Sequence, residues 1–84
     1  MAAQAQPEVV HEFEVDGRGT LRTCLTEFRG RRYMDLRLWV GSAPGGELIA
    51  TRKGLSLPTE YLDELQAAVG VLAHEVRPDD RRVA

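Results

Sequence analysis

Residues 28–57 read FRGRRYMDLRLWVGSAPGGELIATRKGLSL, and the rest of the predicted sheet can be built outward from them. Residues 33–40 of this stretch alternate with a period of two, which is the pattern of a half-buried strand. The pattern therefore predicts a strand with one core face and one charged and aromatic face. The core face holds Met34, Leu36, Leu38 and Val40, and the opposite face holds Tyr33, Asp35, Arg37 and Trp39.

Two more strands are expected on the N-terminal side of this segment. Residues from Val9 to Val15 alternate in the same way, and Asp16-Gly17-Arg18-Gly19 has the composition of a hairpin turn. The second strand is expected from Leu21 to Phe28. Arg29-Gly30 then forms a tight turn, in which Gly30 accommodates positive φ, before the third strand from Arg31 to Val40.

The C-terminal side predicts a loop, a short strand and a helix. Residues 41–46 are rich in Gly and Pro and cannot continue a strand. A fourth strand is expected from Glu47 to Thr51, followed by a turn at Arg52-Lys53-Gly54. Pro58 suits the first position of a helix, and Pro78 lies where that helix should have ended.

The predicted helix carries a narrow apolar seam with spacings of three and four residues, which is typical of a helix that packs on another helix. Because the sequence predicts one helix, the seam must meet either the sheet or the helix of a second copy. The small core favours the second copy, and hence a homodimer. The predicted dimer interface consists of Leu62, Leu65, Val69 and Leu72, and Val76 continues the seam.

The chain has 84 residues, enough for one small domain whose own core is marginal. We expect a mobile tail at residues 1–8, the domain at 9–76 and a charged tail at 77–84. No apolar run is long enough for a membrane span, and the N-terminus does not resemble a signal peptide. With Cys24 as the single cysteine, the composition fits a reducing compartment. We expect a cytoplasmic protein, associated with the nucleoid if it is bacterial.

The net charge of −2 hides a strong segregation of charge along the chain. Residues 1–17 carry four acids and no Lys or Arg, and residues 54–84 carry six acids and three bases. Residues 18–53 carry eight bases and three acids, which gives a central net charge of +5. A basic and aromatic sheet surface can hold a phosphate backbone while bases stack on its rings. The middle of the chain therefore predicts a nucleic-acid-binding surface.

Other roles for these side chains remain open at this level. Trp39 is about equally suited to base stacking and to packing, whereas Phe28 has arginines on its C-terminal side that favour stacking. Asp35 and Arg37 are expected to form a structural ion pair. Arg22 and Arg32 are expected to be solvated residues of the sheet, and Cys24 a small strand residue without a base beside it.

Three blocks of sequence resemble the positive cofactor four family of transcriptional coactivators. They are Phe28-Arg29-Gly30-Arg31, then Asp35-Leu36-Arg37 with Trp39, and Thr51-Arg52-Lys53-Gly54-Leu55-Ser56-Leu57, followed by an amphipathic helix. The resemblance covers about residues 11–75. It implies a curved antiparallel sheet followed by a helix, homodimers formed through the helices and adjoining sheet, and binding of single-stranded DNA or melted duplex along paired channels. Family members often have two adjacent aromatic residues after Asp-x-Arg, whereas here Trp39 is followed by Val40.

The residues and the resemblance together predict an α+β protein, a curved four-stranded antiparallel sheet with one C-terminal helix (ββββα), which binds single-stranded DNA without strong sequence specificity. Its expected role is in transcription regulation or in DNA repair or recombination, with the corresponding machinery as further partners. The alternatives are a dimeric adaptor that docks an acidic polypeptide, and a binder of single-stranded RNA. No catalytic constellation, cofactor or metal site is predicted. The predicted DNA-binding residues are Phe28, Arg29, Arg31, Arg37, Trp39, Arg52 and Lys53.

Overall fold

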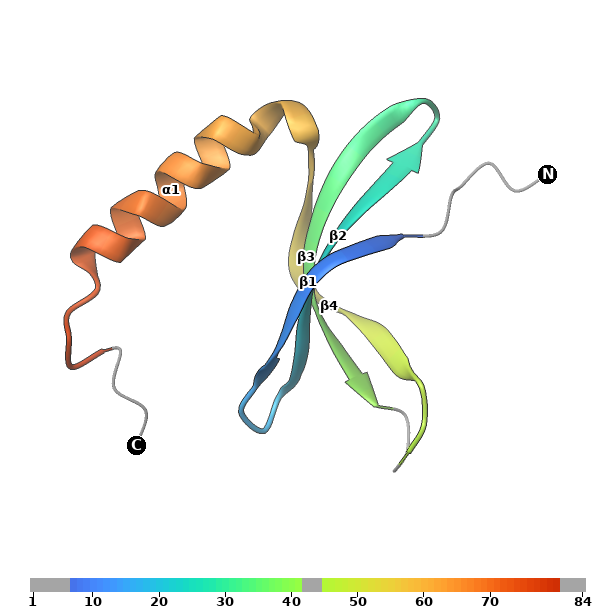
Figure 1. The fold of residues 1–84 in the computed structure, drawn as a ribbon, viewed down its shortest axis with the longest axis horizontal. Coiled ribbons are helices and arrows are strands. Elements are labelled where there is room, and N and C mark those ends of the chain that lie inside the picture. The colour runs from blue at the N-terminus through green and yellow to red at the C-terminus, as the bar shows by residue number, and fades with distance from the viewer. Residues whose placement is uncertain (1–6, 42–44, 81–84) are drawn as a thin grey trace.

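The structure, a computed structural model, describes residues 7–41 and 45–80. Four strands form one antiparallel sheet in the order β1-β2-β3-β4, and a short 3-10 helix and an α-helix follow (Figure 1). The predicted ββββα fold is therefore confirmed. The elements are β1 (Glu8–Val15), β2 (Gly19–Phe28), β3 (Arg31–Gly41), β4 (Leu48–Pro58), η1 (Thr59–Tyr61) and α1 (Leu62–Glu75).

The tight turn between β2 and β3 has the conformation that favours a hairpin. Arg29 has φ 56° and Gly30 has φ 77°, which is the pair of positive φ angles that a two-residue turn of type I′ requires. Gly30 adopts such an angle without steric cost, but Arg29 has a Cβ and is strained in this conformation. The turn fixes the register of the hairpin, so that Phe28 lies opposite Arg31 and Arg22 lies opposite Arg37.

The sheet has two chemically different sides, in agreement with the predicted alternation of β3. Neighbours in the register place side chains on the same side. We call one side the apolar face, which includes Phe13, Leu21, Leu25, Met34, Leu36, Leu38, Leu55 and Leu57. We call the other the charged face, which includes Glu12, Arg22, Phe28, Arg31, Tyr33, Asp35, Arg37 and Trp39.

The predicted end of the fourth strand at Thr51 is wrong, because β4 continues to Pro58. Arg37 pairs with Gly54 and Trp39 pairs with Ala50, so Leu38 alone faces three residues of β4, residues 51–53. What the sequence suggested as a turn is therefore a bulge within a longer strand. The Thr51 hydroxyl holds it together: it donates to the carbonyl oxygen of Leu38 at 2.8 Å and accepts from the backbone N–H of Lys53 at 3.1 Å.

The helix begins later than predicted. Pro58 is the last residue of β4, with φ −58° and ψ 146°, so it precedes η1 and is not the first helical residue. The extended ψ of Pro58 lets the strand run to its end before the chain turns into η1. The α-helix then runs from Leu62 to Glu75. It therefore ends one residue before Val76, the last residue of the predicted seam.

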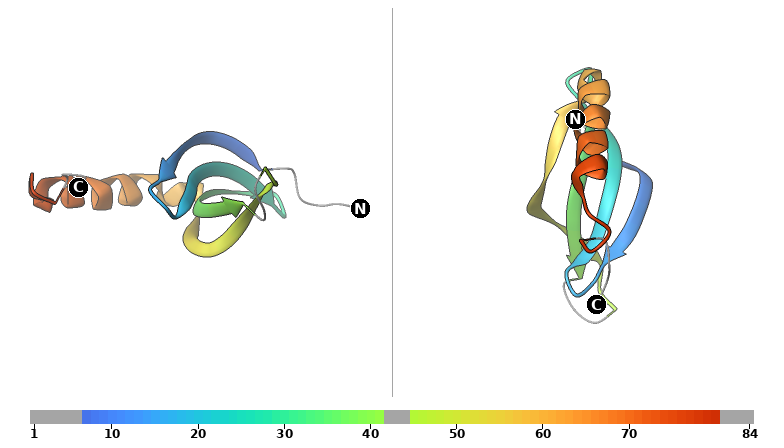
Figure 2. Two further views of the ribbon diagram at one scale, coloured as in Figure 1. Left: turned by 90° about the horizontal axis from the view of Figure 1, so that it is seen from below. Right: turned by 90° about the vertical axis from the view of Figure 1, so that its left-hand side faces the viewer.

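The helix extends away from the sheet instead of packing across it (Figures 1 and 2). None of its residues is buried, and the radius of gyration of 15.1 Å exceeds the about 12 Å expected for a compact chain of this length. Among the described hydrophobic residues, those that are buried are Cys24 and Met34. Thirteen large apolar side chains of the described residues are exposed, so one chain leaves much apolar surface uncovered.

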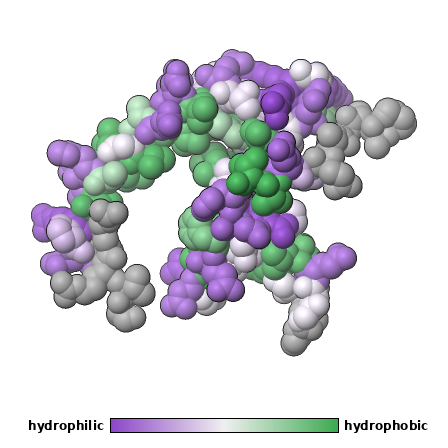
Figure 3. All heavy atoms as spheres, viewed as in Figure 1, coloured by the Kyte–Doolittle hydropathy of each residue, from purple (hydrophilic) through white to green (hydrophobic). Residues whose placement is uncertain are grey.

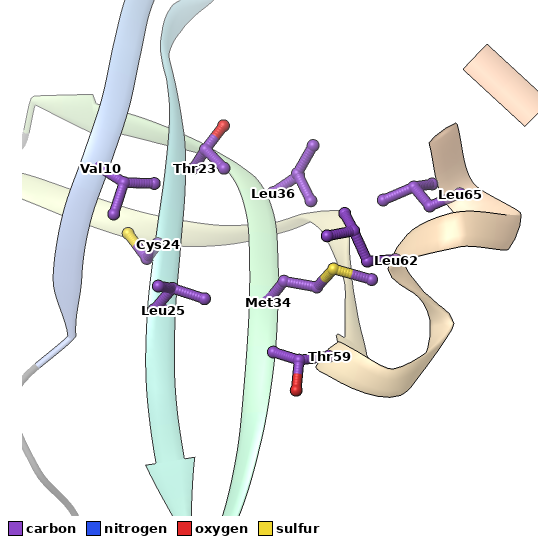
Figure 4. Close-up of a pocket in the computed structure, with 9 residues that line it drawn as sticks. All are labelled: Val10, Thr23, Cys24, Leu25, Met34, Leu36, Thr59, Leu62 and Leu65. Atoms are coloured by element: carbon purple, nitrogen blue, oxygen red, sulfur yellow. The ribbon is translucent and has the colours of Figure 1, made fainter. Parts of the chain in front are cut away.

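An apolar pocket of about 300 Å³ lies where the start of the helix meets the sheet (Figure 4). Leu62 and Leu65 approach it from α1, and Met34 and Leu36 approach it from β3. This is where the helix and the sheet come together, and the pocket shows that one chain does not fill the contact. Three of the predicted segments, the tails at 1–8 and 77–84 and the loop at 41–46, fall partly outside the described residues.

Candidate nucleic-acid interface

The hairpin between β2 and β3 presents aromatic rings and guanidinium groups together at its tip. Phe28 is 38% exposed, and the guanidinium carbon of Arg29 lies 5.0 Å from the centre of its ring. The guanidinium carbon of Arg31 lies 5.9 Å from the ring of Tyr33. These groups combine an accessible stacking ring with cations that can reach a phosphate.

Glu60, in η1, holds one of the cations of the hairpin tip. Its Oε2 lies 3.3 Å from Nη2 of Arg31, and both side chains are more than half exposed. This contact raises the pKa of Arg31 above its ordinary value, through a hydrogen bond to Glu60 and the charge of Glu60. An exposed ion pair of this kind is weak and exchanges readily for another anion. Arg31 can therefore leave Glu60 for a phosphate at little cost.

Arg37, at the centre of the charged face, is held by groups of the chain itself. Its Nε lies 3.2 Å from each carboxylate oxygen of Asp35, and its Nη2 donates to Oδ1 at 2.9 Å. Its Nη1 donates to the carbonyl oxygen of Thr51 at 3.1 Å, which links the pair to the bulge of β4. The hydrogen bond to Asp35 raises the pKa of Arg37, so the guanidinium stays charged. The expected ion pair of Asp35 and Arg37 is present.

Trp39 lies beneath Arg22 on the same face. The guanidinium carbon of Arg22 is 4.6 Å from the ring centre of Trp39, and its Nε donates to Oε1 of Glu12 at 2.8 Å. The ring is half-buried, and its Nε1 is a buried donor without a partner among the described residues. Arg22 is therefore not the freely solvated residue that the sequence pattern suggested.

Arg52 and Lys53 project from the bulge of β4. Both are exposed, and in the part of the chain that the structure describes neither forms an ion pair. The bulge lies on the edge strand, directly after the pair of Trp39 and Ala50 and before the pair of Arg37 and Gly54. Arg52 and Lys53 add two exposed cations to this edge of the sheet, next to the row that contains Arg37.

The seven predicted binding residues thus divide into three groups. Phe28, Arg29 and Arg31 meet at the hairpin tip, Arg52 and Lys53 share the bulge, and Arg37 and Trp39 lie between them under contacts within the chain. The sequence pattern did not predict the contacts of Arg22 with Glu12 and Trp39. Counting residues outward from the turn between Val15 and Gly19 places Glu12 opposite Arg22, so a signal for this contact was present in the sequence.

Cys24 lies in the same face, opposite Asp35, and is 1% exposed. Burial raises the pKa of its thiol above its ordinary value, and the charge of Asp35 adds to this effect. A thiol of this kind stays protonated and unreactive at neutral pH. Cys24 is a packing residue, as expected.

Within residues 7–41 and 45–80, no group of three or more acidic, His or Cys side chains is placed to hold a metal ion. The same part of the chain contains no helix long and apolar enough to cross a membrane.

Comparisons with known proteins agree with this fold. A family model described as Transcriptional Coactivator p15 (PC4) matches residues 16–68, which include β2, β3, β4, η1 and the first half of α1. The crystal structure of a PC4 homolog from Burkholderia pseudomallei superposes with a TM-score of 0.73 and 25% sequence identity. That match covers 81% of this chain and 98% of the homolog. No curated protein sequence matches the chain.

Proposed function

The chain belongs to the PC4 family of transcriptional coactivators, and from this premise we propose that it binds single-stranded DNA through its charged face. The observation that carries the proposal is the hairpin tip, where an exposed Phe28 ring lies beside the guanidinium groups of Arg29 and Arg31. Unpaired bases can stack on the ring while the cations hold the phosphates. Such contacts do not depend on base identity, so we propose binding with little sequence specificity.

The proposed ligand is a single strand because of the kind of contact that the surface offers. Bases in a duplex are stacked on one another and cannot reach an isolated ring, whereas a single strand or a melted duplex can. The proposed role follows from this ligand: regulation of transcription, or repair or recombination of DNA, in the cytoplasm or on the nucleoid. The proteins of that machinery are the expected further partners.

Cations of the site set the expected salt dependence. Arg29, Arg31, Arg52 and Lys53 are exposed and either unpaired among the described residues or weakly paired. If these four meet phosphates, log K should fall with log salt concentration with a slope of about −3, from about 0.7 per contact for single strands.

The proposed binding unit is a homodimer. Along α1, Leu62, Val69 and Leu72 are 49%, 55% and 61% exposed, and Figure 3 shows hydrophobic residues at the surface along the helix. Leu65 of the predicted interface lines the unfilled pocket against the sheet. A second copy would cover the seam and pair two charged faces, as the resemblance implies. A chain with so little buried surface would be marginal alone.

Fluorescence anisotropy with labelled oligo(dT) tests the proposed function. Wild-type protein should bind at low salt, and Phe28→Ala should bind about 5- to 140-fold more weakly, because stacking contributes roughly 1–3 kcal/mol per base. Phe13→Ala is the matched control, because Phe13 is 50% exposed but lies on the apolar face. Its affinity should stay close to that of the wild type, with molar mass measured for both variants.

Two results would contradict the proposal. Wild-type protein that does not bind oligo(dT) at low salt would refute it, and binding to an acidic polypeptide instead would favour the adaptor function. Binding that is insensitive both to salt and to Phe28→Ala would also refute it. A parallel titration with oligo(U) shows whether RNA is preferred.

A further inference from the structure

We propose that Arg22 is a phosphate-binding residue at the centre of the charged face, held in place by Glu12 and by the indole ring of Trp39. This inference rests on the proposed binding of single-stranded DNA and names a contact within that site. The sequence placed Arg37 among the predicted DNA-binding residues and suggested that Arg22 is a solvated residue of the sheet. The hydrogen bonds of the two arginines support the opposite assignment.

The two arginines lie in one row across the sheet. The register places Glu12, Arg22, Arg37 and Gly54 side by side on β1, β2, β3 and β4. Because Arg22 and Arg37 are direct neighbours on β2 and β3, a nucleic-acid strand on the charged face that comes within reach of one also comes within reach of the other. Two like charges in directly opposite positions destabilise a sheet unless each is neutralised or held apart. Here each arginine has its own carboxylate, Glu12 for Arg22 and Asp35 for Arg37.

Arg37 has few donors left for a ligand. All three of its nitrogens donate within the chain, to both oxygens of Asp35 and to the carbonyl oxygen of Thr51. The two arginines are similarly exposed, at 21% for Arg37 and 24% for Arg22, but the carboxylate partner of Arg37, Asp35, is only 16% exposed and therefore poorly solvated. A phosphate that recruited Arg37 would have to leave the carboxylate of Asp35 without its partner, which is costly in a shielded position.

Arg22 uses its donors differently. Its Nε donates to Glu12, whereas its two terminal nitrogens have no partner among the described residues. The two terminal nitrogens of the guanidinium group therefore remain available to bind a phosphate through two parallel hydrogen bonds. Its carboxylate partner is 49% exposed, so water can solvate Glu12 when the charge of Arg22 is shared with a phosphate. The side chain of Arg22 is also restrained before binding, which lowers the entropy lost on contact.

Trp39 acts as a positioning residue for Arg22. The guanidinium lies over the ring at 4.6 Å, the range of a favourable cation–π contact. A base could stack on this side of the indole only after Arg22 had moved. The ring therefore supports the arginine, and the two roles that the sequence left open for Trp39 resolve in favour of packing. Phe28, at the hairpin tip, is the ring that contacts bases.

Salt-dependent anisotropy with oligo(dT) tests the contact of Arg22. Arg22→Gln should bind about 5- to 10-fold more weakly at about 50 mM salt, and the slope of log K against log salt should become shallower by about 0.7. Arg77→Gln is the matched control, because it removes the same charge from a residue that follows the helix. Its slope should equal that of the wild type. Equal slopes for Arg22→Gln and Arg77→Gln would overturn the proposal.

The fluorescence of Trp39 tests its supporting role already in the wild type, because the chain contains one tryptophan. If Arg22 stays between the ring and the nucleotides, saturating oligo(dT) should change the emission of the wild type only slightly. In Arg22→Lys, which keeps the charge but cannot cover the ring with a planar group, quenching should increase. Strong quenching of the wild type would show direct stacking on Trp39 and overturn this assignment, even if Arg22→Gln failed to fold.

The two proposals fail in different ways. Wild-type protein that does not bind oligo(dT) would refute the proposed function, and the contact of Arg22 with it. Wild-type protein that binds, together with Arg22→Gln that binds with unchanged affinity and slope, would refute the contact of Arg22 alone.

Discussion

Two valines on α1 provide a sharp test of the proposed dimer. Val69 and Val71 are two residues apart and similarly exposed in one chain, at 55% and 62%. Val69 belongs to the predicted apolar seam, whereas Val71 points away from it, because two residues correspond to about 200° around a helix. If the seam is the dimer interface, Val69→Ala should weaken the dimer and Val71→Ala should not.

The exposure of Val69 sets the size of the effect. Removing two methyl groups from a fully buried valine costs roughly 1.6 kcal/mol in lost burial, at about 0.8 kcal/mol for each group. About 55% of Val69 is left for a partner to cover, which corresponds to roughly 0.9 kcal/mol in each copy. A two-fold interface contains the residue twice, so the dimer should lose about 1.8 kcal/mol. The dissociation constant should therefore rise about 20-fold.

Sedimentation velocity over a dilution series measures this constant for the wild type and both variants. The two substitutions change helix propensity by the same amount, so their difference reports the interface alone. Equal dissociation constants for Val69→Ala and Val71→Ala would refute the assignment of the seam. A wild-type protein that stays monomeric at high concentration would refute the dimer itself.

Three further predictions concern the sheet. Gly54→Ala should lower the free energy of unfolding by about 1–3 kcal/mol, because the new Cβ would lie 2.6 Å from the Cα of Arg37. Gly70→Ala is the control: it has open space around it and should raise the free energy of unfolding by about 1 kcal/mol. Chemical denaturation measures both. Arg29→Gly should raise stability by about 0.5–1 kcal/mol by removing strain at φ 56°, yet weaken oligo(dT) binding, and a loss of both would contradict the strain. Because burial raises the pKa of Cys24 in the folded state, unfolding should become easier as pH rises above about 8.5, where the unfolded chain loses the thiol proton first. Melting curves of Cys24→Ala should show a smaller decline over that range, and an equal decline would rule out this thiol as the cause.

Local sequence was sufficient for the first three strands. Their alternation has a period of two, and the turn at 29–30 contains the glycine that a tight hairpin requires, so both the faces and the register could be predicted. The seam of α1 was predicted for the same reason, from a period close to that of a helix. These features depend on neighbours in sequence.

The extent of β4 depends on a contact that local sequence does not contain. Arg52-Lys53-Gly54 has the composition of a turn, and the chain would turn there if the residues were free of β3. In the structure, the hydroxyl of Thr51 satisfies the carbonyl of Leu38, and Gly54 lets β4 approach the backbone of β3 closely. The strand therefore continues, because β3 supplies the hydrogen-bond partners that hold residues 51–58 in an extended conformation.

The same limit applies to the candidate site. The sequence pattern identified which residues carry charge and rings, and it predicted the pair of Asp35 and Arg37, but it did not predict the pair of Arg22 and Glu12. Arg37 and Arg22 have similar positions in the alternation of their strands, yet one donates from all three nitrogens and the other from one. That difference arises from carboxylates at two and ten residues' distance along the chain, whose reach depends on the curvature of the sheet.

The bulge of β4 is a place where side chains can be substituted at little cost to the stability of the fold. The pairing of β3 and β4 shifts by two residues across it, an even number, so the side chains beyond it return to their original sides. Residues 52 and 53 are thus extruded from the ladder without altering the core. Substitution there could tune affinity, or preference among ligands, while folding is left intact, which makes this short segment a natural starting point for engineering new variants.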